Sequence, residues 1–375
     1  MTNIKLGDLC KSCAGQIKVE DGELIDYIDI SSIDNEKKKL IGFQTMPFGE
    51  SPSRARKVVK KGSILVSTVR PNLNAIAVLE NDTPNISVAS TGFCILDCKD
   101  DVDNRFVFNF CKSRKFIDDM VSKATGASYP AVSDKIIRSA LVPNYTYEEQ
   151  CNISKVLDSI SDIIDKREAE LFSLDELIKA RFVELFGDPV KNPKGWEVVT
   201  IGDIATEVRY GTSKPAVEGG KYPYLRMNNI TSDGHLDLND LKYIDITEDE
   251  IEKCVVRKGD VLFNRTNSIE LVGKTAVFDL LDDMVIAGYI IRVRLNERIL
   301  PEVFSQYMNL EALKNILRSM AKGAVNQANI NAQELQSIKV YIPDMGAQKK
   351  FIEIKDQVDK SKVAVQKALD ETQLL

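Results

Sequence analysis

The feature that most constrains the fold is an apolar repeat in the middle of the chain, between Tyr147 and Phe186. Its apolar residues follow one another in alternating steps of four and three, a period of about 3.5 residues that is typical of a coiled-coil seam. Neither Pro nor Gly interrupts the stretch before Gly187-Asp188-Pro189, which is a helix stop. A helix of this length would extend for roughly 60 Å, whereas helices of globular domains run for about 8 to 20 residues. The pattern favours a rod-like helix; a buried helix of one large domain is the alternative.

Apolar side chains form the seam of this helix and that of a second, shorter helix, which is predicted from about Gln348 onward. The first seam contains Ile153, Leu157, Ile160, Ile164, Leu171, Leu174, Ile178, Phe182 and Leu185, and the second contains Phe351, Ile354, Val358, Val365 and Leu369. Arg167 and Arg181 occupy the two gaps in the first series. Their long stems can lie along an apolar seam, so they do not break it.

The blocks before and after the long helix echo each other in sequence. Five segments recur in the same order, at offsets between 195 and 200 residues. Ile4-Lys5-Leu6-Gly7-Asp8-Leu9 returns as Val199-Thr200-Ile201-Gly202-Asp203-Ile204, Lys60-Lys61-Gly62-Ser63-Ile64-Leu65 as Arg257-Lys258-Gly259-Asp260-Val261-Leu262, Ala124-Thr125-Gly126-Ala127 as Ala321-Lys322-Gly323-Ala324, Val142-Pro143 as Ile342-Pro343, and Gln150 as Gln348. Such matches indicate a duplicated unit, a globular block followed by a long helix.

Each block combines strand-like and helix-like patterns without the regular alternation of a βαβ fold. Strands are predicted over residues 24–30, 63–69, 74–79 and 87–96, a helix over residues 103–122, and the matching helix of the second block over residues 301–320. We therefore predict an α/β fold of the mixed, α+β-like type. The expected globular domains are residues 1–146 and 187–345, and the expected long helices are residues 147–186 and 346–375.

Composition is that of an ordinary globular protein. No apolar run approaches the ~20 residues of a membrane span and no signal-peptide pattern opens the chain, so we expect a cytoplasmic protein. The seven cysteines are then expected to be free thiols. Cys10-x-x-Cys13 could join Cys94 and Cys98 in a zinc site, but the second pair has the wrong spacing and the repeat lacks matching cysteines. We therefore expect no metal.

One stretch of the chain has a strongly one-sided charge, although the net charge of the whole is −6. Between Ser51 and Leu79 there is no carboxylate. The cations of this stretch are Arg54, Arg56, Lys57, Lys60, Lys61 and Arg70. Such a stripe is what neutralisation of DNA phosphates needs. A solvated charged surface is an equally good interpretation of the charge alone.

Polar loops at corresponding places of the two blocks supply further candidate DNA contacts. Arg and Lys side chains pair with guanine edges, Asn and Gln with adenine edges, and Ser and Thr with either. The first block contributes Lys123, Ser128 and Tyr129, and the second contributes Arg209, Tyr210, Thr212, Ser213, Lys214, Arg226, Asn228, Asn264, Arg265, Thr266, Asn267, Lys274, Lys322, Asn326 and Gln327. Each residue alone is more often an ordinary surface group, but the clustering in both repeats favours recognition.

Motifs for catalysis are missing from the sequence. His235 is the one histidine, and it follows the turn signal Asp233-Gly234, so a surface position is expected. Gly273-Lys274-Thr275 resembles the end of a phosphate-binding loop, but Ser268 stands where that motif needs its first glycine. We therefore predict no catalytic residues and a chain that is not an enzyme.

The layout resembles the specificity subunit of Type I restriction–modification enzymes. Two globular units, each with a Gly-Asp entry segment, a Lys-Gly strand and a Gly-Ala loop, alternate with two long helices. The first helix ends in Ser173-Leu174-Asp175-Glu176-Leu177-Ile178-Lys179-Ala180-Arg181-Phe182-Val183-Glu184-Leu185-Phe186-Gly187-Asp188-Pro189, which is similar to the helix ending of that family. The resemblance covers essentially the whole chain. The second helix is shorter, and its entry at Asp344-Met345-Gly346-Ala347-Gln348 departs from the apolar-Pro-Glu-Gln pattern.

The resemblance implies a DNA-recognition subunit. Each globular unit would be a target-recognition domain that reads one half of a split, asymmetric sequence in double-stranded DNA, and the two long helices would pair as an antiparallel coiled coil. The chain itself would bind no cofactor. It would dock two modification subunits, which methylate adenine N6 with S-adenosylmethionine, and ATP- and Mg-dependent restriction subunits, which are translocases and nucleases.

Other classes of protein are also compatible with the sequence. One is a non-catalytic coiled-coil scaffold with two protein-binding heads, which would bind DNA without salt sensitivity or not at all. Another is an enzyme whose acid–base pair carries no sequence motif. A third keeps DNA recognition but in a modification-only or phage-defence assembly. Self-association through the shorter helix is also compatible with the sequence.

Overall fold

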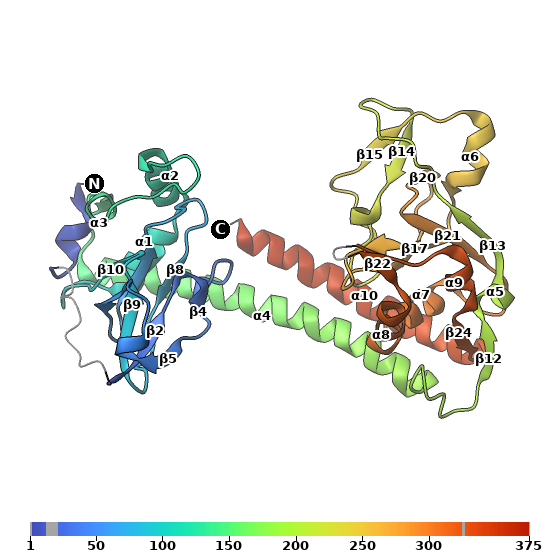
Figure 1. The fold of residues 1–375 in the computed structure, drawn as a ribbon, viewed down its shortest axis with the longest axis horizontal. Helices are drawn as coiled ribbons and strands as arrows, with labels where there is room; N and C mark the ends of the chain where they lie inside the picture. Colours follow the sequence, from blue (N-terminus) through green and yellow to red (C-terminus); the bar gives the residue numbers. More distant parts are fainter. Residues whose placement is uncertain (1, 13–21, 325–326, 375) are drawn as a thin grey trace. The chain divides into compact units, whose positions relative to one another are not determined.

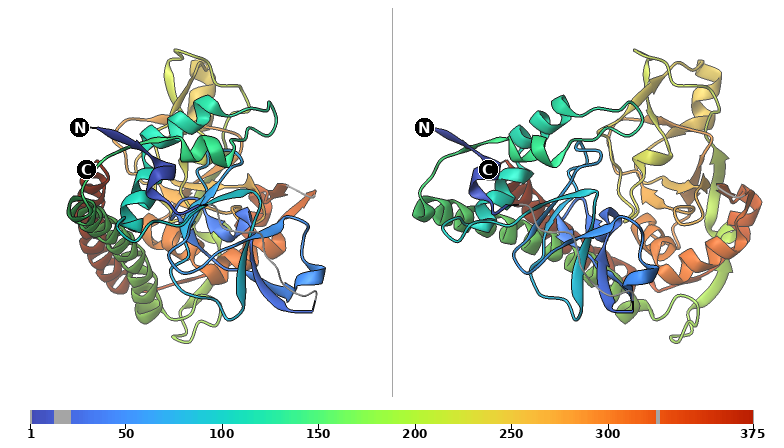
Figure 2. Two further views of the ribbon diagram at one scale, coloured as in Figure 1. Left: turned by 90° about the vertical axis from the view of Figure 1, so that its left-hand side faces the viewer. Right: turned by 60° about the vertical axis from the view of Figure 1, so that its left-hand side comes forward.

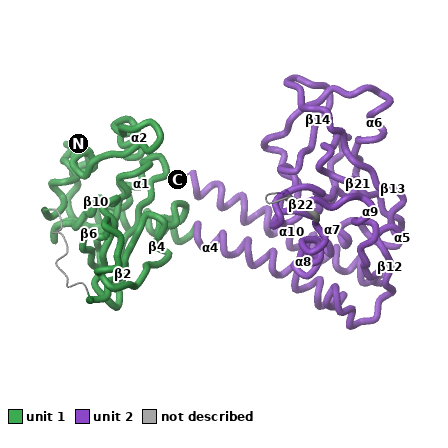
Figure 3. The backbone as a smooth tube through the Cα atoms, in the orientation of Figure 1, with its two compact units in different colours: residues 1–163 green, residues 164–375 purple. Residues whose placement is uncertain are grey.

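The protein, seen in a computed structural model, is described here over residues 2–12, 22–324 and 327–374. Contacts between residues divide the chain into two compact units, Met1–Ile163 (unit 1) and Ile164–Leu375 (unit 2), as Figure 3 shows. The boundary falls inside helix α4 (Tyr147–Phe186), the helix that the apolar repeat predicts. Within the described ranges, no helix has the length and apolar character needed to cross a membrane.

Unit 1 is built around two sheets. One has the strand order β10-β7-β8 and the other the order β5-β2-β9-β6, while β1 pairs with β11 and β3 with β4. Helix α1 packs against β7 and β8 (Figure 1). The strands are β1 (Asn3–Lys5), β2 (Leu24–Ile28), β3 (Ile33–Asp34), β4 (Lys39–Leu40), β5 (Gln44–Pro47), β6 (Ala55–Val58), β7 (Ile64–Ser67), β8 (Ile76–Val78), β9 (Ile86–Ser90), β10 (Phe93–Leu96) and β11 (Leu141–Pro143), and the helices are α1 (Asn104–Lys112), α2 (Arg114–Lys123) and α3 (Asp134–Arg138).

Unit 2 repeats the plan. Its sheets have the orders β13-β21-β17-β19, β15-β14-β20-β16 and β18-β23-β22, and β12 pairs with β24. Helix α7 packs against both β19 and α10. The strands are β12 (Glu197–Thr200), β13 (Ala205–Tyr210), β14 (Tyr222–Leu225), β15 (Lys242–Ile244), β16 (Val255–Val256), β17 (Val261–Asn264), β18 (Thr266–Asn267), β19 (Thr275–Val277), β20 (Met284–Ile286), β21 (Ile290–Leu295), β22 (Lys322–Ala324), β23 (Gln327–Asn329) and β24 (Lys339–Ile342), and the helices are α5 (Ile201–Ile204), α6 (Glu248–Cys254), α7 (Pro301–Asn309), α8 (Glu311–Met320), α9 (Ala332–Ser337) and α10 (Met345–Gln373).

The duplication predicted from the sequence is confirmed by topology and by hydrogen bonds. In unit 1, β2 lies parallel to β9 and antiparallel to β5; in unit 2, β14 lies parallel to β20 and antiparallel to β15. Gln150 Oε1 accepts from Asp103 N (3.0 Å) before α1, and Gln348 Oε1 accepts from Leu300 N (2.8 Å) before α7. The two glutamines thus tie the start of each long helix to the same place in its globular block.

Three predicted elements are divided in the structure. The expected helix over residues 103–122 is α1 and α2, because the extended Ser113 (ψ 145°) ends one and caps the other by accepting from Phe116 N. The expected helix over residues 301–320 is α7 and α8, which are separated at the extended, buried Leu310. The expected strand over residues 87–96 is β9 and β10, with a turn at residues 91–92 between them.

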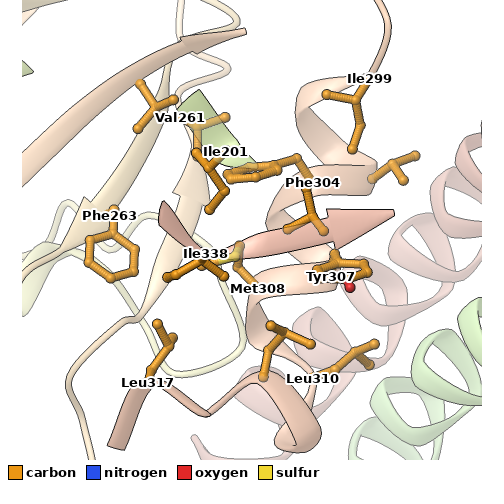
Figure 4. Close-up of a cluster of buried hydrophobic side chains, with 14 of the residues drawn as sticks. Ile201, Val261, Phe263, Ile299, Phe304, Tyr307, Met308, Leu310, Leu317 and Ile338 are labelled. Atoms are coloured by element: carbon orange, nitrogen blue, oxygen red, sulfur yellow. The ribbon is translucent and has the colours of Figure 1, made fainter. Parts of the chain in front are cut away.

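The core of unit 2 joins the sheets to the helices. Figure 4 shows Phe304 and Tyr307 of α7, Val261 and Phe263 of β17, and Leu310 pointing into one apolar cluster. Phe182 and Phe186 at the end of α4 and Phe351 of α10 belong to the same cluster. The long helices are therefore anchored in the globular core of this unit.

In unit 2 the second part of α4, residues 164–186, pairs with α10 in the antiparallel sense (Figures 1 and 2). The Phe182 and Phe351 rings lie 5.4 Å apart, Lys362 Nζ donates to Asp175 Oδ1 (2.5 Å), and Arg167 donates to Thr372 Oγ1 (2.5 Å). Residue numbers fall along α4 as they rise along α10, which is the antiparallel register. Arg167 fills its gap in the apolar seam, as its long stem allows.

The residues of the two predicted seams differ in burial. Ile178, Phe182, Phe351, Val358 and Leu369 are buried, and Ile160, Ile164, Leu171, Leu174, Leu185, Ile354 and Val365 are half-buried. Ile153 packs against the core of unit 1, and Leu157 is 39% exposed. Ile153, the first residue of the predicted seam, therefore anchors the start of α4 in the globular core of unit 1.

Unit 2 also contains a pocket of about 270 Å³. Lys314 of α8 lines this pocket, is 7% exposed, and donates from Nζ to Gly273 O (2.5 Å). Burial lowers the pKa of Lys314 to about 7, because the charged form loses its hydration, and the charges of Arg318 and Lys274 outweigh the opposite effect of Glu311.

Replacing this lysine should stabilise unit 2 at neutral pH. The unfolded chain binds more protons than the folded chain between about pH 7 and pH 10.5, so the stability of the wild type rises with pH across this window. We expect Lys314→Met to raise the free energy of unfolding by about 2 kcal/mol at pH 7. Urea unfolding at pH 7 and pH 10 should show the gain shrinking at the higher pH; a constant gain would contradict the prediction.

Candidate nucleic-acid interface

In unit 1, two loops bring an arginine and an aromatic ring together. Arg70 follows β7 in a left-handed conformation (φ 48°), and its backbone N donates to Pro130 O (2.7 Å). The Arg70 guanidinium lies 5.2 Å from the centre of the Tyr129 ring, which is 70% exposed. Ala131 forms bridges with both Val69 and Thr125 and so holds the two loops in place. A guanidinium stacked on an exposed ring is suited to contacts with phosphates and bases.

Arg54 lies at the same end of unit 1. The backbone oxygen of Arg54 accepts a hydrogen bond from Thr91 N (2.8 Å). Gly92, which follows Thr91, accepts from Thr68 N (2.8 Å) beside the Arg70 loop. The exposed Arg54 guanidinium donates to Tyr27 Oη (3.0 Å) and Asp29 Oδ2 (2.5 Å). The orientation of the Arg54 side chain is therefore fixed by Tyr27 and Asp29 of unit 1.

The rest of the predicted basic stripe lies elsewhere. Lys57 Nζ donates to Phe93 O (2.6 Å) and Asp134 Oδ2 (2.7 Å), so its charge is used inside the unit. Lys60 and Lys61 are exposed at the turn before β7, at the opposite end of that strand from Arg70. The cations that are close in the sequence therefore do not form one surface patch, because the buried strand β7 separates Lys60 and Lys61 from Arg70.

Three further candidates of unit 1 have separate surroundings. Arg56 is half-buried, with its guanidinium 5.6 Å from the centre of the Phe48 ring. Lys123 pairs with Asp119 on α2 (2.7 Å). Ser128 is exposed beside Tyr129. Of these, Ser128 alone belongs to the Arg70–Tyr129 cluster by its place in the loop.

In unit 2, Arg265 and Tyr210 form the matching cluster. The Arg265 guanidinium lies 4.9 Å from the centre of the Tyr210 ring, which is 43% exposed. Arg265 N donates to Tyr289 O (2.9 Å), and Tyr210 Oη accepts from Ala332 N (2.7 Å). The arginine is thus held between the end of β13 and the turn before β21.

Two more loops reach this cluster. Thr212 is bridged to Ala287, and Gly288 N donates to Thr212 O (2.7 Å). β18 pairs with β23 through Thr266↔Asn329. The exposed or half-buried polar residues of these loops are Thr212, Ser213, Asn267 and Gln327. The bridge at Thr266↔Asn329 corresponds to Val69↔Ala131 of unit 1, so both arginines follow the same strand of the repeat. The aromatic ring comes from the loop before Ala131 in unit 1 and from the end of β13 in unit 2.

Several candidates of unit 2 are buried and unsuited to DNA contact. Asn264 is 0% exposed and Thr266 5% exposed. Lys274 is 8% exposed, and its Nζ donates to Met227 O (3.0 Å) and to Ile230 O. Burial lowers the pKa of Lys274, and the two carbonyl oxygens replace water around its ammonium group. The polar groups of these three residues are therefore buried inside unit 2, and Lys274 is engaged with backbone carbonyls, which does not favour the predicted DNA contacts.

Other cations of unit 2 are exposed or half-buried but paired. Arg209 pairs with Glu207 (2.9 Å), Lys214 with Glu250 (2.6 Å), and the half-buried Arg226 with Asp240 (2.7 Å). Asn228 is exposed in the 3-10 helix at Met227–Asn229. The Lys322 side chain and Asn326 lie outside the described residues.

Tyr289 is an exposed residue of this interface that the sequence analysis does not predict. Tyr289 is 51% exposed at the turn between β20 and β21, and its carbonyl holds Arg265. The pair Gly288-Tyr289 between two apolar strands is the signal that could have identified it.

The described residues contain no cluster of His, Cys, Asp and Glu side chains suited to a metal ion. Cys13, which the zinc hypothesis needs, lies outside them. His235 is exposed, and its Nδ1 lies 2.9 Å from Asp233 Oδ2, as expected for a surface turn. That hydrogen bond holds the pKa of Asp233 well below its usual range.

Parts of this chain are similar in sequence to known proteins. Residues 193–372 match the family described as Type I restriction modification DNA specificity domain. The Type I restriction enzyme EcoKI specificity subunit of Escherichia coli is 24% identical over 269 residues, which cover 68% of this chain and 58% of that protein. The putative type I restriction enzyme MjaX specificity subunit of Methanocaldococcus jannaschii is 32% identical over 171 residues, 44% of this chain and 40% of that protein. The chain thus spans less than two thirds of either relative.

Solved structures share the fold over nearly the whole chain. A chain from a study of complex assembly and conformational transition of the type I R-M system matches with a TM-score of 0.62 at 23% identity, covering 99% of this chain and 93% of that one. The S subunit of a Type-I restriction-modification system from M. genitalium matches with a TM-score of 0.54 at 14% identity, covering 100% and 93%. These likenesses show that the chain has the fold of these S subunits, and that residues 193–372 match the Type I restriction modification DNA specificity domain.

Proposed function

We propose that this chain is the DNA sequence-recognition subunit of a Type I restriction–modification complex and reads a bipartite, asymmetric target in double-stranded DNA. The observation that supports this most is that each unit presents an arginine stacked on an exposed tyrosine ring, Arg70 with Tyr129 in unit 1 and Arg265 with Tyr210 in unit 2. Because the two clusters differ in their surrounding residues, we expect the two half-sites to differ in sequence. A palindromic target would contradict this part of the proposal.

The proposal includes the domain division and the partners. Residues 1–146 and 187–345 would be the two target-recognition domains, and residues 147–186 and 346–375 the helices between and after them. The chain would be non-catalytic and would dock two modification subunits, which use S-adenosylmethionine, and restriction subunits, which use ATP and Mg. The relatives come from prokaryotes, whose DNA lies in the cytoplasm, and we propose the same location for this chain.

A map of N6-methyladenine across the source genome, with this gene intact and deleted, tests the proposal. We expect one split, non-palindromic motif to lose its methylation completely on deletion. If no motif changes although the modification partner is expressed, DNA recognition is refuted and a scaffold with two protein-binding heads is favoured. Salt-insensitive binding of DNA would favour the same alternative, because phosphate contacts make affinity fall as salt rises.

Single substitutions in the two clusters should weaken recognition of one half-site each. We expect Arg265→Ala and Arg70→Ala each to reduce affinity for the methylated motif about 5- to 150-fold, as for the loss of a base-contacting arginine. Fluorescence anisotropy of the chain in complex with its modification partner, on DNA altered in one half-site at a time, measures the effect.

Arg114→Ala is the matched control, since Arg114 is an exposed arginine of α2 paired with Asp118 and lies outside both clusters. Its affinity should stay within about twofold of the wild type. Equal losses for Arg114→Ala and Arg265→Ala would mean that net charge, and not the clusters, determines binding.

A further inference from the structure

Two cysteines of unit 1 face each other across adjacent backbone segments. Cys10 follows the 3-10 helix at Leu6–Leu9, and Cys98 lies shortly after β10. They are antiparallel bridge partners, and the flanking hydrogen bonds run from Lys11 N to Asp97 O (2.7 Å) and from Lys99 N to Leu9 O (3.0 Å). Cys10 and Cys98 therefore form a non-hydrogen-bonded antiparallel pair, in which the two residues exchange no backbone hydrogen bonds with each other.

This position suits a covalent link. In such pairs the two Cα atoms are about 4.5 Å apart and the side chains are close, and disulfides span Cα separations of about 4.4 to 6.8 Å. The two thiols already share a hydrogen bond, and both are reduced. The backbone would need little movement to bring the two sulfurs to bonding distance.

The surroundings favour reactivity of one thiol. The hydrogen bond with Cys98 lowers the pKa of the Cys10 thiol, and Arg138 also lowers it, although burial acts in the opposite direction. Arg138 is fixed beside the pair because its guanidinium donates to Lys11 O (3.1 Å) and Ile95 O (3.0 Å), one on each segment. Cys10 is 4% exposed, but its sulfur lies beside the half-buried Cys98, so a small reagent that enters on the Cys98 side meets the Cys10 sulfur.

We propose that Cys10 and Cys98 form a redox-responsive dithiol, which low-molecular-weight disulfides convert into a cross-strand disulfide. The Cys10 thiolate attacks one sulfur of the small disulfide, forms a mixed disulfide and releases one thiolate. The Cys98 thiol then gives its proton to that thiolate and attacks the Cys10 sulfur. The Cys10–Cys98 bond forms, and the second small thiolate leaves.

The link would tie the entry segment of unit 1 to its sheet. Cys98 lies beyond the end of β10 at Leu96, whereas Gly92, which neighbours the Arg70 loop, precedes the other end of that strand. The dithiol and the candidate interface thus lie at opposite ends of β10. Oxidation should therefore stabilise unit 1 against unfolding without blocking the interface, and the inference does not depend on the proposed function.

Thiol mapping of the full chain in glutathione buffers tests the proposal. After acid quenching and alkylation with N-ethylmaleimide, peptides are identified by tandem mass spectrometry. We expect Cys10 and Cys98 to lose alkylation together as oxidised glutathione increases, and a peptide pair linked through these two residues to appear. Half-oxidation should need a ratio of oxidised to reduced glutathione about tenfold lower in the folded chain than in concentrated urea.

The variants separate this pair from other cysteines. Cys13→Ser should form the same link, whereas Cys98→Ser should give no link to Cys10. Cys94 and Cys111 are fully buried and should form no disulfide at any glutathione ratio. Full alkylation of both Cys10 and Cys98 across the series, a Cys10–Cys13 link in its place, or equal oxidation in urea would each overturn the proposal. These readouts use the wild type, so a variant that fails to fold does not decide the result.

Discussion

Phe182→Ala is expected to lower the free energy of unfolding of unit 2 by about 3 to 5 kcal/mol, the usual cost of removing a fully buried phenylalanine ring. Phe182 is 0% exposed, and its ring centre lies 4.7 Å from that of Phe186, 5.4 Å from that of Phe351 and 5.9 Å from that of Tyr307. The ring therefore joins α4 to α10 and to the globular core. Removing it leaves a cavity where three elements meet.

Urea unfolding followed by the fluorescence of Trp196, the one tryptophan of the chain, measures this effect. The Trp196 indole N–H donates to Phe186 O (2.8 Å) at the end of α4, so its emission reports on this region. Phe172→Ala is the matched control, because Phe172 lies on the same helix and is 67% exposed. The control should change stability by no more than about 0.5 kcal/mol. Equal losses for the two variants would show that Phe182 does not anchor the helices.

Glu207→Ala should cost about 3 to 5 kcal/mol, because it leaves a buried arginine without its carboxylate. Arg292 is 0% exposed, and its guanidinium donates to Glu207 Oε2 (2.7 Å) and to Val255 O. Arg294 donates to the same oxygen (2.8 Å). Burial raises the pKa of the Glu207 carboxyl, but the hydrogen bond from Arg209 and the charges of Arg292 and Arg294 outweigh it, so the pKa lies below its usual value.

A surface ion pair, Glu197 of β12 with Arg298, gives the comparison. Glu197 and Arg298 lie 2.6 Å apart, but both side chains are exposed, so Glu197→Ala should cost about 0 to 1 kcal/mol. The double variant Glu207→Ala with Arg292→Met should recover most of the loss, because it removes the buried charge together with its partner. The same Trp196 transition measures all three. A double variant as unstable as Glu207→Ala would mean that packing around Glu207, and not the Arg292 charge, sets the cost.

Local patterns of the sequence were enough to predict the long helix and the duplication. The helix α4 covers Tyr147–Phe186, because an unbroken apolar period without Pro or Gly determines the backbone locally. The internal repeat is visible in the sequence alone, and it predicts that Gln150 and Gln348 are equivalent residues, which their hydrogen bonds confirm. The resemblance to specificity subunits rested on this layout and is now supported by the shared fold.

The composition of the candidate interface was decided by tertiary structure. Lys274 and Arg265 are both basic residues next to a strand, yet one is buried against backbone carbonyls and the other stacks on Tyr210. Burial of a polar side chain depends on segments far away in the sequence, so a local pattern cannot separate the two. The same reason explains why Tyr289 was missed.

The order of the parts, globular block, long helix, globular block and long helix, follows from the sequence alone. This order depends on periodicity and repetition, which are properties of the chain alone. Tertiary structure decided where α1 and α2 separate at Ser113, where α7 and α8 separate at Leu310, and which cations share one surface. These outcomes follow from packing between distant segments, because burial of Leu310 in the core outweighs the helical preference of its neighbours.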